Sequence, residues 1–190
     1  LNIVYLSEFF GLPEVASFWE SVIKLNNWQQ HRISKLIVKK LFGTLSNKKI
    51  VILGFAFKAN TNDTRESPAI NVCKDLLEEG ASLIIHDPKV SSDQINFDLN
   101  FESTKHLGKD SNNSIDVEGK WHKENDLIAS FKDADAVVLL TEWSEYKNID
   151  WKEVYKEMRK PSWVFDTRSI TNPTEVRNAG LNFWRIGDGV

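Results

Sequence analysis

An uninterrupted apolar run, IVILGFAF at 50–57, follows Lys48 and Lys49 and restricts the possible folds more than any other part of the sequence. A strand with one exposed face alternates polar and apolar residues, whereas a parallel strand buried on both faces is apolar throughout. The run therefore predicts a buried strand of a parallel sheet.

The residues after this run complete a βαβ unit. Ser67 and Pro68 are suited to the N-cap and the first position of a helix, and Gly80 can end that helix. A second apolar segment at 81–86 follows and predicts the second strand. The crossover between the two strands should be right-handed.

The same alternation resumes after a polar stretch at 91–125, which has no sustained period and is interpreted as a surface excursion. The later elements are predicted at 127–132 (helix), 136–141 (strand), 151–158 (helix), 163–166 (strand), 173–178 (helix) and 182–186 (strand). Five strands alternating with helices predict an α/β fold, a Rossmann-like doubly wound parallel sheet.

A long helix should precede this sheet. Pro13 can begin it and Gly43 can end it, and the apolar stripe between them consists of Val15, Trp19, Val22, Ile33, Ile37 and Leu41. At 1.5 Å per residue the helix is roughly 45 Å long, which is typical of helices that link domains or form subunit interfaces. We therefore expect a helical, dimerising segment at 1–45 and an α/β domain at 46–190.

The composition limits the classes of molecule that the chain is expected to bind. The 24 basic and 27 acidic residues give a net charge of −3, and no basic stripe or apolar span indicates nucleic acid or a membrane. The single cysteine, Cys73, cannot form an internal disulfide, which fits a reducing, cytoplasmic setting. We expect small molecules or further copies of the chain as partners. Because the sequence opens on Leu1 within a helical pattern, it reads as part of a longer protein.

Ligands of open parallel sheets bind beyond the carboxyl ends of the strands. The first turn contains one glycine, Gly54, where a dinucleotide site needs several, so NAD is not expected on this sheet. Lys58 and Arg168 follow strands and together suit a diphosphate, although each alone is more often a solvated charge. Asp87 is interpreted as a turn former, and Cys73 as a small buried residue.

A longer motif supports a specific family. The run GFAFKANTNDTRESPAI at 54–70 resembles the signature of the UDP-glucose/GDP-mannose dehydrogenase family. Further segments are similar in order and spacing: LNIVYL, LPEVASFWESVIKLNNWQ, HDPKV, VVLLTEW and VFDTRS. The resemblance covers nearly the whole chain, and the stretch at 91–125 is the least alike.

GFAFK and TRES are most similar to the family's UDP-glucose 6-dehydrogenases, with GDP-mannose and UDP-N-acetylmannosamine dehydrogenases as alternatives. The resemblance implies oxidation of UDP-glucose to UDP-glucuronate by two NAD through a cysteine-linked intermediate. It also implies that Phe57, Lys58 and Arg168 bind the UDP-sugar and that Arg65 reaches NAD held mainly by another domain. The catalytic cysteine and the NAD domain should precede Leu1, so we expect no catalytic residue, no metal site and no turnover in this chain.

One position departs from the family pattern, which usually has glycine where Thr167 stands. If that position needs φ > 0, threonine should strain the loop that carries Arg168. Two other functions stay open on the sequence. The first is a stand-alone nucleotide-sugar-binding module. The second is a structural interface that mainly assembles through the long helix.

Overall fold

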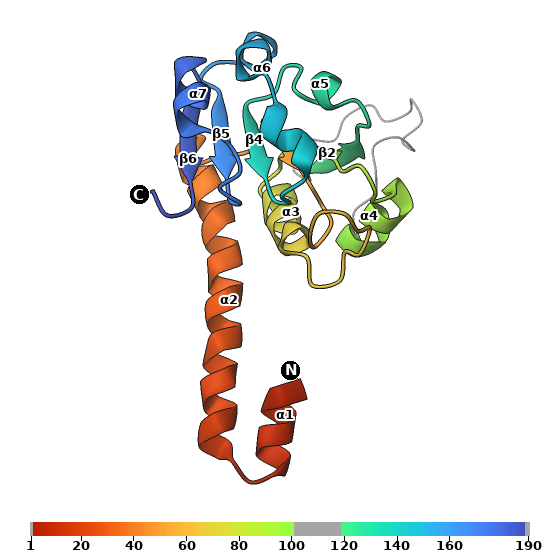
Figure 1. Cartoon of the computed structure of the whole chain (residues 1–190), viewed down its shortest axis with the longest axis vertical. Helices are drawn as coiled ribbons and strands as arrows, with labels where there is room; N and C mark the ends of the chain where they lie inside the picture. The colour runs from red at the N-terminus through yellow and green to blue at the C-terminus, as the bar shows by residue number, and fades with distance from the viewer. Residues whose placement is uncertain (1, 101–118, 189–190) are drawn as a thin grey trace.

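The protein is described at residues 2–100 and 119–188 by a computed structural model (Figure 1). Within these residues a sheet of six parallel strands has the order β3-β2-β1-β4-β5-β6. The strands are β1 (Lys49–Leu53), β2 (Ser82–His86), β3 (Lys120–Lys123), β4 (Ala136–Leu139), β5 (Trp163–Asp166) and β6 (Asn182–Arg185). The order reverses between β1 and β4, and ligands of such sheets bind at this switch point.

The two central strands form the core. β1 pairs with β4 from Ile50 opposite Ala136 to Leu53 opposite Leu139, and every residue of β4 is buried. β1 ends at Leu53, before the end of its apolar run, because Gly54 turns the chain with φ of 92°. The predicted Rossmann-like parallel sheet is confirmed.

Helices connect the strands. They are α3 (Pro68–Glu78), α4 (Ser92–Leu99), α5 (Leu127–Ser130), the 3-10 helix η2 (Ser144–Asn148), α6 (Trp151–Glu157) and α7 (Pro173–Asn178). Ser67 caps α3 as predicted, since its hydroxyl accepts a hydrogen bond from the amide of Ala69, and Pro68 occupies the first turn. Cys73 lies on α3 and is fully buried, and this burial raises the pKa of its thiol.

A helical hairpin extends away from the sheet, with α1 (Asn2–Phe9) folded back beside α2 (Pro13–Lys40), as Figure 1 shows. Only the end of α2 nearest the sheet is anchored on α3. There His31 Nδ1 lies 2.8 Å from Asp75 Oδ2, and Gln30 accepts a hydrogen bond from Asn71. No helix in the described parts of the chain is both long and apolar enough to cross a bilayer.

The predicted stripe on α2 is buried only in part. Ile33, Ile37 and Leu41 are buried against the sheet domain. Val15 is exposed, and Ala16 is buried in the hairpin instead. The difference arises because α1 covers a different face of α2 from the one that the sheet domain covers.

The interpretation of 91–125 as an irregular excursion is wrong at both ends. The stretch begins with α4, capped by Ser91, and β3 lies near its end. Both elements bury few residues, Ile95 and Leu99 in α4 and Trp121 in β3, so their apolar pattern is weak. The rest of the predicted excursion, at 101–118, lies outside the described residues.

Candidate functional site

A cavity of about 980 Å³ lies at the switch point, between the α1–α2 hairpin and the carboxyl ends of β1, β4 and β5. From the sheet domain it is lined by Phe57, Glu66, Pro68, Val72, Leu140, Thr167, Arg168 and Ile186. From the hairpin it is lined by Asn2, Ile3, Ile23, Asn26, Asn27, Gln29, Gln30 and Ile33. This volume is in the range of small-molecule sites.

The turn after β1 is packed closely against the turn after β4. A Cβ atom added to Gly54 would lie 2.3 Å from the Cβ of Thr141, closer than real side chains approach. Thr141 is buried, and its hydroxyl donates a 2.7 Å hydrogen bond to the carbonyl oxygen of Ala56. Gly54 thus serves to bring two loops together.

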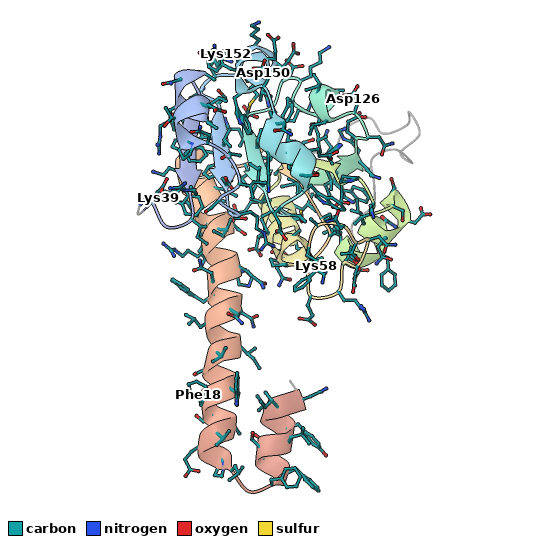
Figure 2. All side chains as sticks on the ribbon, in the orientation of Figure 1. Phe18, Lys39, Lys58, Asp126, Asp150 and Lys152 are labelled. Carbon is teal, nitrogen blue, oxygen red and sulfur yellow. The ribbon has the colours of Figure 1, made fainter. Side chains whose placement is uncertain are left out.

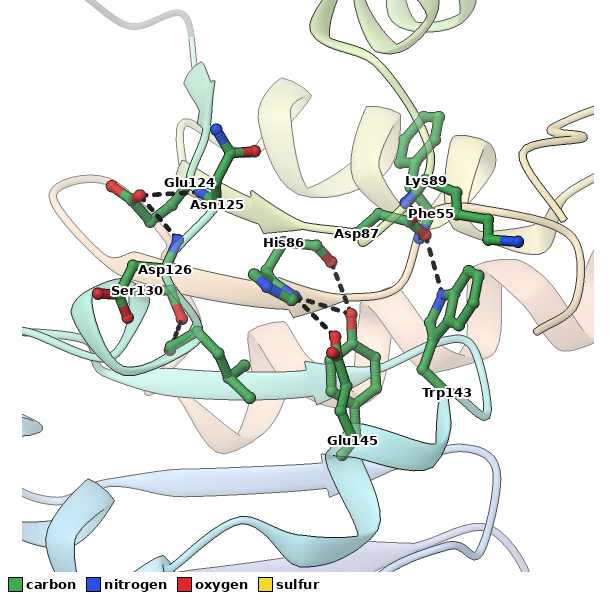
Figure 3. A network of polar contacts seen from close by, with 12 residues as sticks. Phe55, His86, Asp87, Lys89, Glu124, Asn125, Asp126, Ser130, Trp143 and Glu145 are labelled. Carbon is green, nitrogen blue, oxygen red and sulfur yellow. Dashed lines mark hydrogen bonds and ion pairs between the residues drawn. The ribbon is translucent and has the colours of Figure 1, made fainter. Parts of the chain in front are cut away.

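Asp87, at the end of β2, holds the same turn from the other side (Figure 3). Its Oδ2 accepts hydrogen bonds from the amides of Phe55 and Ala56 at 2.8 and 3.0 Å, and from Trp143 Nε1 at 3.2 Å. Its Oδ1 accepts from the amides of Lys89 and Val90. A dinucleotide site needs such amides for pyrophosphate and such a carboxylate for ribose. In this chain the amides and the carboxylate bond to each other, so this turn does not present them to a dinucleotide.

A second network lies beside Asp87 in Figure 3. Tyr146 is buried, lies 3.0 Å from His86 Nδ1 and donates to the carbonyl oxygen of His86. Burial lowers the pKa of His86 and raises the pKa of Tyr146, so both groups are held neutral. Neither residue lines the cavity, and we assign this network to the fold.

Phe57 and Lys58 follow this turn but differ in placement. Phe57 lines the cavity, and its amide donates to the carbonyl oxygen of Asp63. Lys58 is exposed and is not among the lining residues. Figure 2 shows Lys58 at the edge of the sheet domain that faces the hairpin, so a ligand that leaves the cavity on this side would meet its charge.

Arg168 is held at the cavity by Asp166, the last residue of β5. The buried Asp166 carboxylate accepts from the amide of Arg168 at 2.9 Å, and from the amides of Ile170 and Thr171 and the hydroxyl of Thr171. Arg168 Nε donates to the carbonyl oxygen of Leu140 at 2.7 Å. The same Nε lies 3.6 Å from Glu142 Oε2, whereas within the described residues the two terminal nitrogens have no hydrogen bond and are available to an anion.

Thr167 does not strain this loop. Its hydroxyl donates to the carbonyl oxygen of Leu139 at 2.6 Å, and the left-handed residue of the loop is Ser169, with φ of 55°. The expectation of strain at Thr167 assumed that φ > 0 falls where the family has glycine, and the loop places it two residues later.

Arg65 lies outside the cavity. It is 88% exposed and forms a two-point ion pair with Asp63, with Nη2 2.7 Å from Oδ2 and Nε 2.9 Å from Oδ1. Hydrogen bonds from the Arg65 side chain and amide lower the pKa of Asp63 from 3.8 to about 2. The structure therefore separates Arg65 from Phe57 and Arg168.

The cavity residues on α2 were not predicted from the sequence. Asn26, Asn27 and Gln30 line the cavity, whereas the prediction for this helix rested on its apolar positions alone. The signal was present as a gap in the apolar stripe between Val22 and Ile33. Polar residues at inward-facing helix positions indicate a polar neighbour or a solvent-filled space.

Comparison with known proteins agrees with this geometry. A sequence profile described as the UDP-glucose/GDP-mannose dehydrogenase family, UDP binding domain, matches residues 51–173. The chain is 44% identical to UDP-glucose 6-dehydrogenase 2 of Arabidopsis thaliana and 41% identical to UDP-glucose 6-dehydrogenase of Drosophila melanogaster, each over 98% of its length. It spans only 39% and 38% of those proteins.

The fold also agrees with a solved structure. A UDP-glucose dehydrogenase from Pyrobaculum islandicum aligns with 95% of this chain and 34% of its own, with a TM-score of 0.65 and 24% identity. The profile, which covers the turns after β1, β2 and β4 and the Arg168 loop, and the two relatives agree on one assignment. The chain belongs to the UDP-glucose/GDP-mannose dehydrogenase family, and residues 51–173 are its UDP binding domain.

Proposed function

We propose that this chain is the UDP-sugar-binding part of a UDP-glucose 6-dehydrogenase, an enzyme that oxidises UDP-glucose to UDP-glucuronate with two NAD. The observation that carries the proposal is Arg168, whose terminal nitrogens are free of described hydrogen bonds in a cavity at the switch point. A guanidinium binds two phosphate oxygens at once. The identity to UDP-glucose 6-dehydrogenases favours glucose over mannose or N-acetylmannosamine.

In this proposal the pyrophosphate lies against Arg168, with Lys58 as a second positive charge outside the cavity. Phe57 is half exposed on the cavity wall, where its ring can pack on the base or a sugar. Two cations on neighbouring loops suit a group with two negative charges.

The oxidation itself requires residues outside 1–190. The only cysteine, Cys73, is buried in α3 with a raised pKa, so the chain offers no thiolate for a covalent intermediate. NAD is likewise assigned to another domain, because the amides that would hold it here are bound to Asp87. Arg65, exposed beside the cavity loop, is the residue we assign to NAD contact.

Two further assignments complete the proposal. The chain self-associates through the hairpin, which exposes Phe9, Phe10, Phe18, Leu25 and Trp28. Exposed apolar clusters of this kind mark interaction surfaces. The protein functions in the cytoplasm, a setting that suits a single unpaired thiol.

Calorimetric titration tests the function. We expect the chain to bind UDP-glucose and UDP but not NAD, and we expect Arg168→Ala and Lys58→Ala to weaken the binding of both nucleotides. For Arg168→Ala the affinity should fall by about 10- to 150-fold, since a charge-assisted hydrogen bond contributes about 1.5–3 kcal/mol. Lys152→Ala, at the far end of the sheet domain in Figure 2, is the matched control and should bind normally. Tight binding of NAD alone, or preference for GDP-mannose, would contradict the proposal.

A further inference from the structure

The inward face of α2 changes character where it passes the cavity. Positions 23, 26, 27, 30 and 33 all line the cavity, and their i, i+3, i+4 and i+7 spacing places them on one helical face. The ends of this stripe are the apolar Ile23 and Ile33, whereas its middle consists of three carboxamides. A helix that faces only its own domain would be apolar throughout this stripe.

Local structure gives no reason for the two asparagines. Asn26 and Asn27 lie in the interior of a 28-residue helix, where asparagine is disfavoured because its side chain competes for backbone hydrogen bonds. Gln30 is bonded to Asn71, so it anchors α2 on α3. Among the described residues, neither Asn26 nor Asn27 makes a side-chain hydrogen bond, and both side chains are exposed.

The chemistry of the wall indicates what it binds. A carboxamide offers two N–H donors and an acceptor oxygen without charge, which matches a hydroxyl group that both donates and accepts. The sheet-domain wall of the cavity carries Arg168, which suits phosphate. The cavity therefore has one wall with charged groups, the Arg168 guanidinium and the Glu66 carboxylate, and one uncharged hydrogen-bonding wall. A nucleotide sugar has an anionic part, which suits the guanidinium, and hydroxyl-rich rings.

We propose that Asn26 and Asn27 bind the hydroxyl groups of a sugar ring of the nucleotide sugar and so contribute to substrate specificity. This inference rests on the proposed function and adds residues that lie outside the UDP binding domain at 51–173. The ring is either the hexose or the ribose, because both present neighbouring hydroxyls.

The test is titration of the Asn26→Ala/Asn27→Ala variant with UDP-glucose and with UDP. We expect UDP-glucose affinity to fall about tenfold, since one net hydrogen bond contributes about 0.5–1.5 kcal/mol. Unchanged UDP affinity would assign the hexose, and an equal fall for both ligands would assign the ribose. Alanine has the higher helix propensity, so the thermal midpoint should not fall.

Asn96→Ala is the matched control, because Asn96 is an exposed asparagine in the interior of α4 and does not line the cavity. It should leave both affinities unchanged. If the unaltered chain binds UDP-glucose and the double variant binds it equally well, the inference is overturned while the proposed function stands. If the unaltered chain binds neither nucleotide, the proposed function fails and the inference fails with it.

Discussion

The two halves of α2 meet opposite environments. Toward its C-terminal end, Ile37 is 0% exposed, packed beneath the sheet domain. Toward its N-terminal end, Leu25 is 62% exposed, although the two side chains are equally apolar. The sheet domain thus completes its own core, whereas the hairpin presents apolar surface to its surroundings.

This difference indicates how each region is stabilised. Burial of apolar area, at about 25 cal/mol per Å², stabilises the sheet domain within one chain. The hairpin gains burial from the contact of α1 with α2 and leaves large aromatic side chains exposed, among them Phe9 and Phe18. We therefore expect the sheet domain to set the stability of the chain and the hairpin to set its association.

The largest effect is expected from a substitution in the sheet domain, at the point where the turns after β1 and β4 lie closest together. Gly54→Ala should destabilise the chain by on the order of 4 kcal/mol, since a left-handed residue costs about 1–2 and overpacking costs about 1–3 kcal/mol. The added Cβ would lie 2.3 Å from that of Thr141. Chemical denaturation measures the change.

Gly43→Ala is the matched control at the end of the long helix. Gly43 also has positive φ, of 81°, but a Cβ there would meet nothing within 4 Å. It should cost only about 1–2 kcal/mol. Equal losses at Gly54 and Gly43 would show that the close approach of the two turns contributes nothing.

The next prediction compares the two halves of α2 directly. Ile37→Ala should cost about 2–5 kcal/mol, because it removes a fully buried side chain. Leu25→Ala should change the stability by less than about 0.5 kcal/mol, as exposed positions do. Leu25→Ala should instead reduce self-association in light scattering. If Leu25→Ala lowers the stability and leaves self-association unchanged, the comparison between the two halves of α2 is wrong.

The smallest effect concerns the exposed pair of Arg65 and Asp63. The pKa of Asp63 is lowered to about 2 in the folded state. The pair therefore contributes to the stability of the fold above pH 3.8, and this contribution is lost as the pH falls toward 2. Arg65→Ala should return the pKa of Asp63 toward 3.8, measured by NMR titration of its carboxyl carbon. Arg177→Ala should leave that titration unaltered. An unshifted Asp63 in the Arg65 variant would mean that the pair does not form in solution.

Much of the sheet was predictable because its central strands are buried on both faces. The buried parts of β1 and β4 are apolar throughout, and that of β2 is apolar up to His86, so the sequence pattern was direct. β3 was missed because, as an edge strand, it pairs on one side only with β2 and buries Trp121 alone. A single buried residue does not produce a period.

Residues of the site were predictable only where they belong to a recognisable sequence motif. Phe57 and Arg168 were identified and share the cavity, but their roles in binding stay predictions. The role of Asp87 in the turn followed from its position, whereas its contact with Trp143 depends on β4 lying beside β1. The gap in the apolar stripe of α2 marks its carboxamides as unusual, but their place in the cavity depends on how the helix packs against the sheet domain, which the gap does not specify.

Cys73 gives the molecule a built-in reporter. It is the one thiol in the sequence, it lies on the buried face of α3, and its burial keeps it protonated. A thiol-specific reagent can react with it only after α3 has separated from the sheet. The labelling rate therefore counts opening events of the sheet domain without any engineered probe.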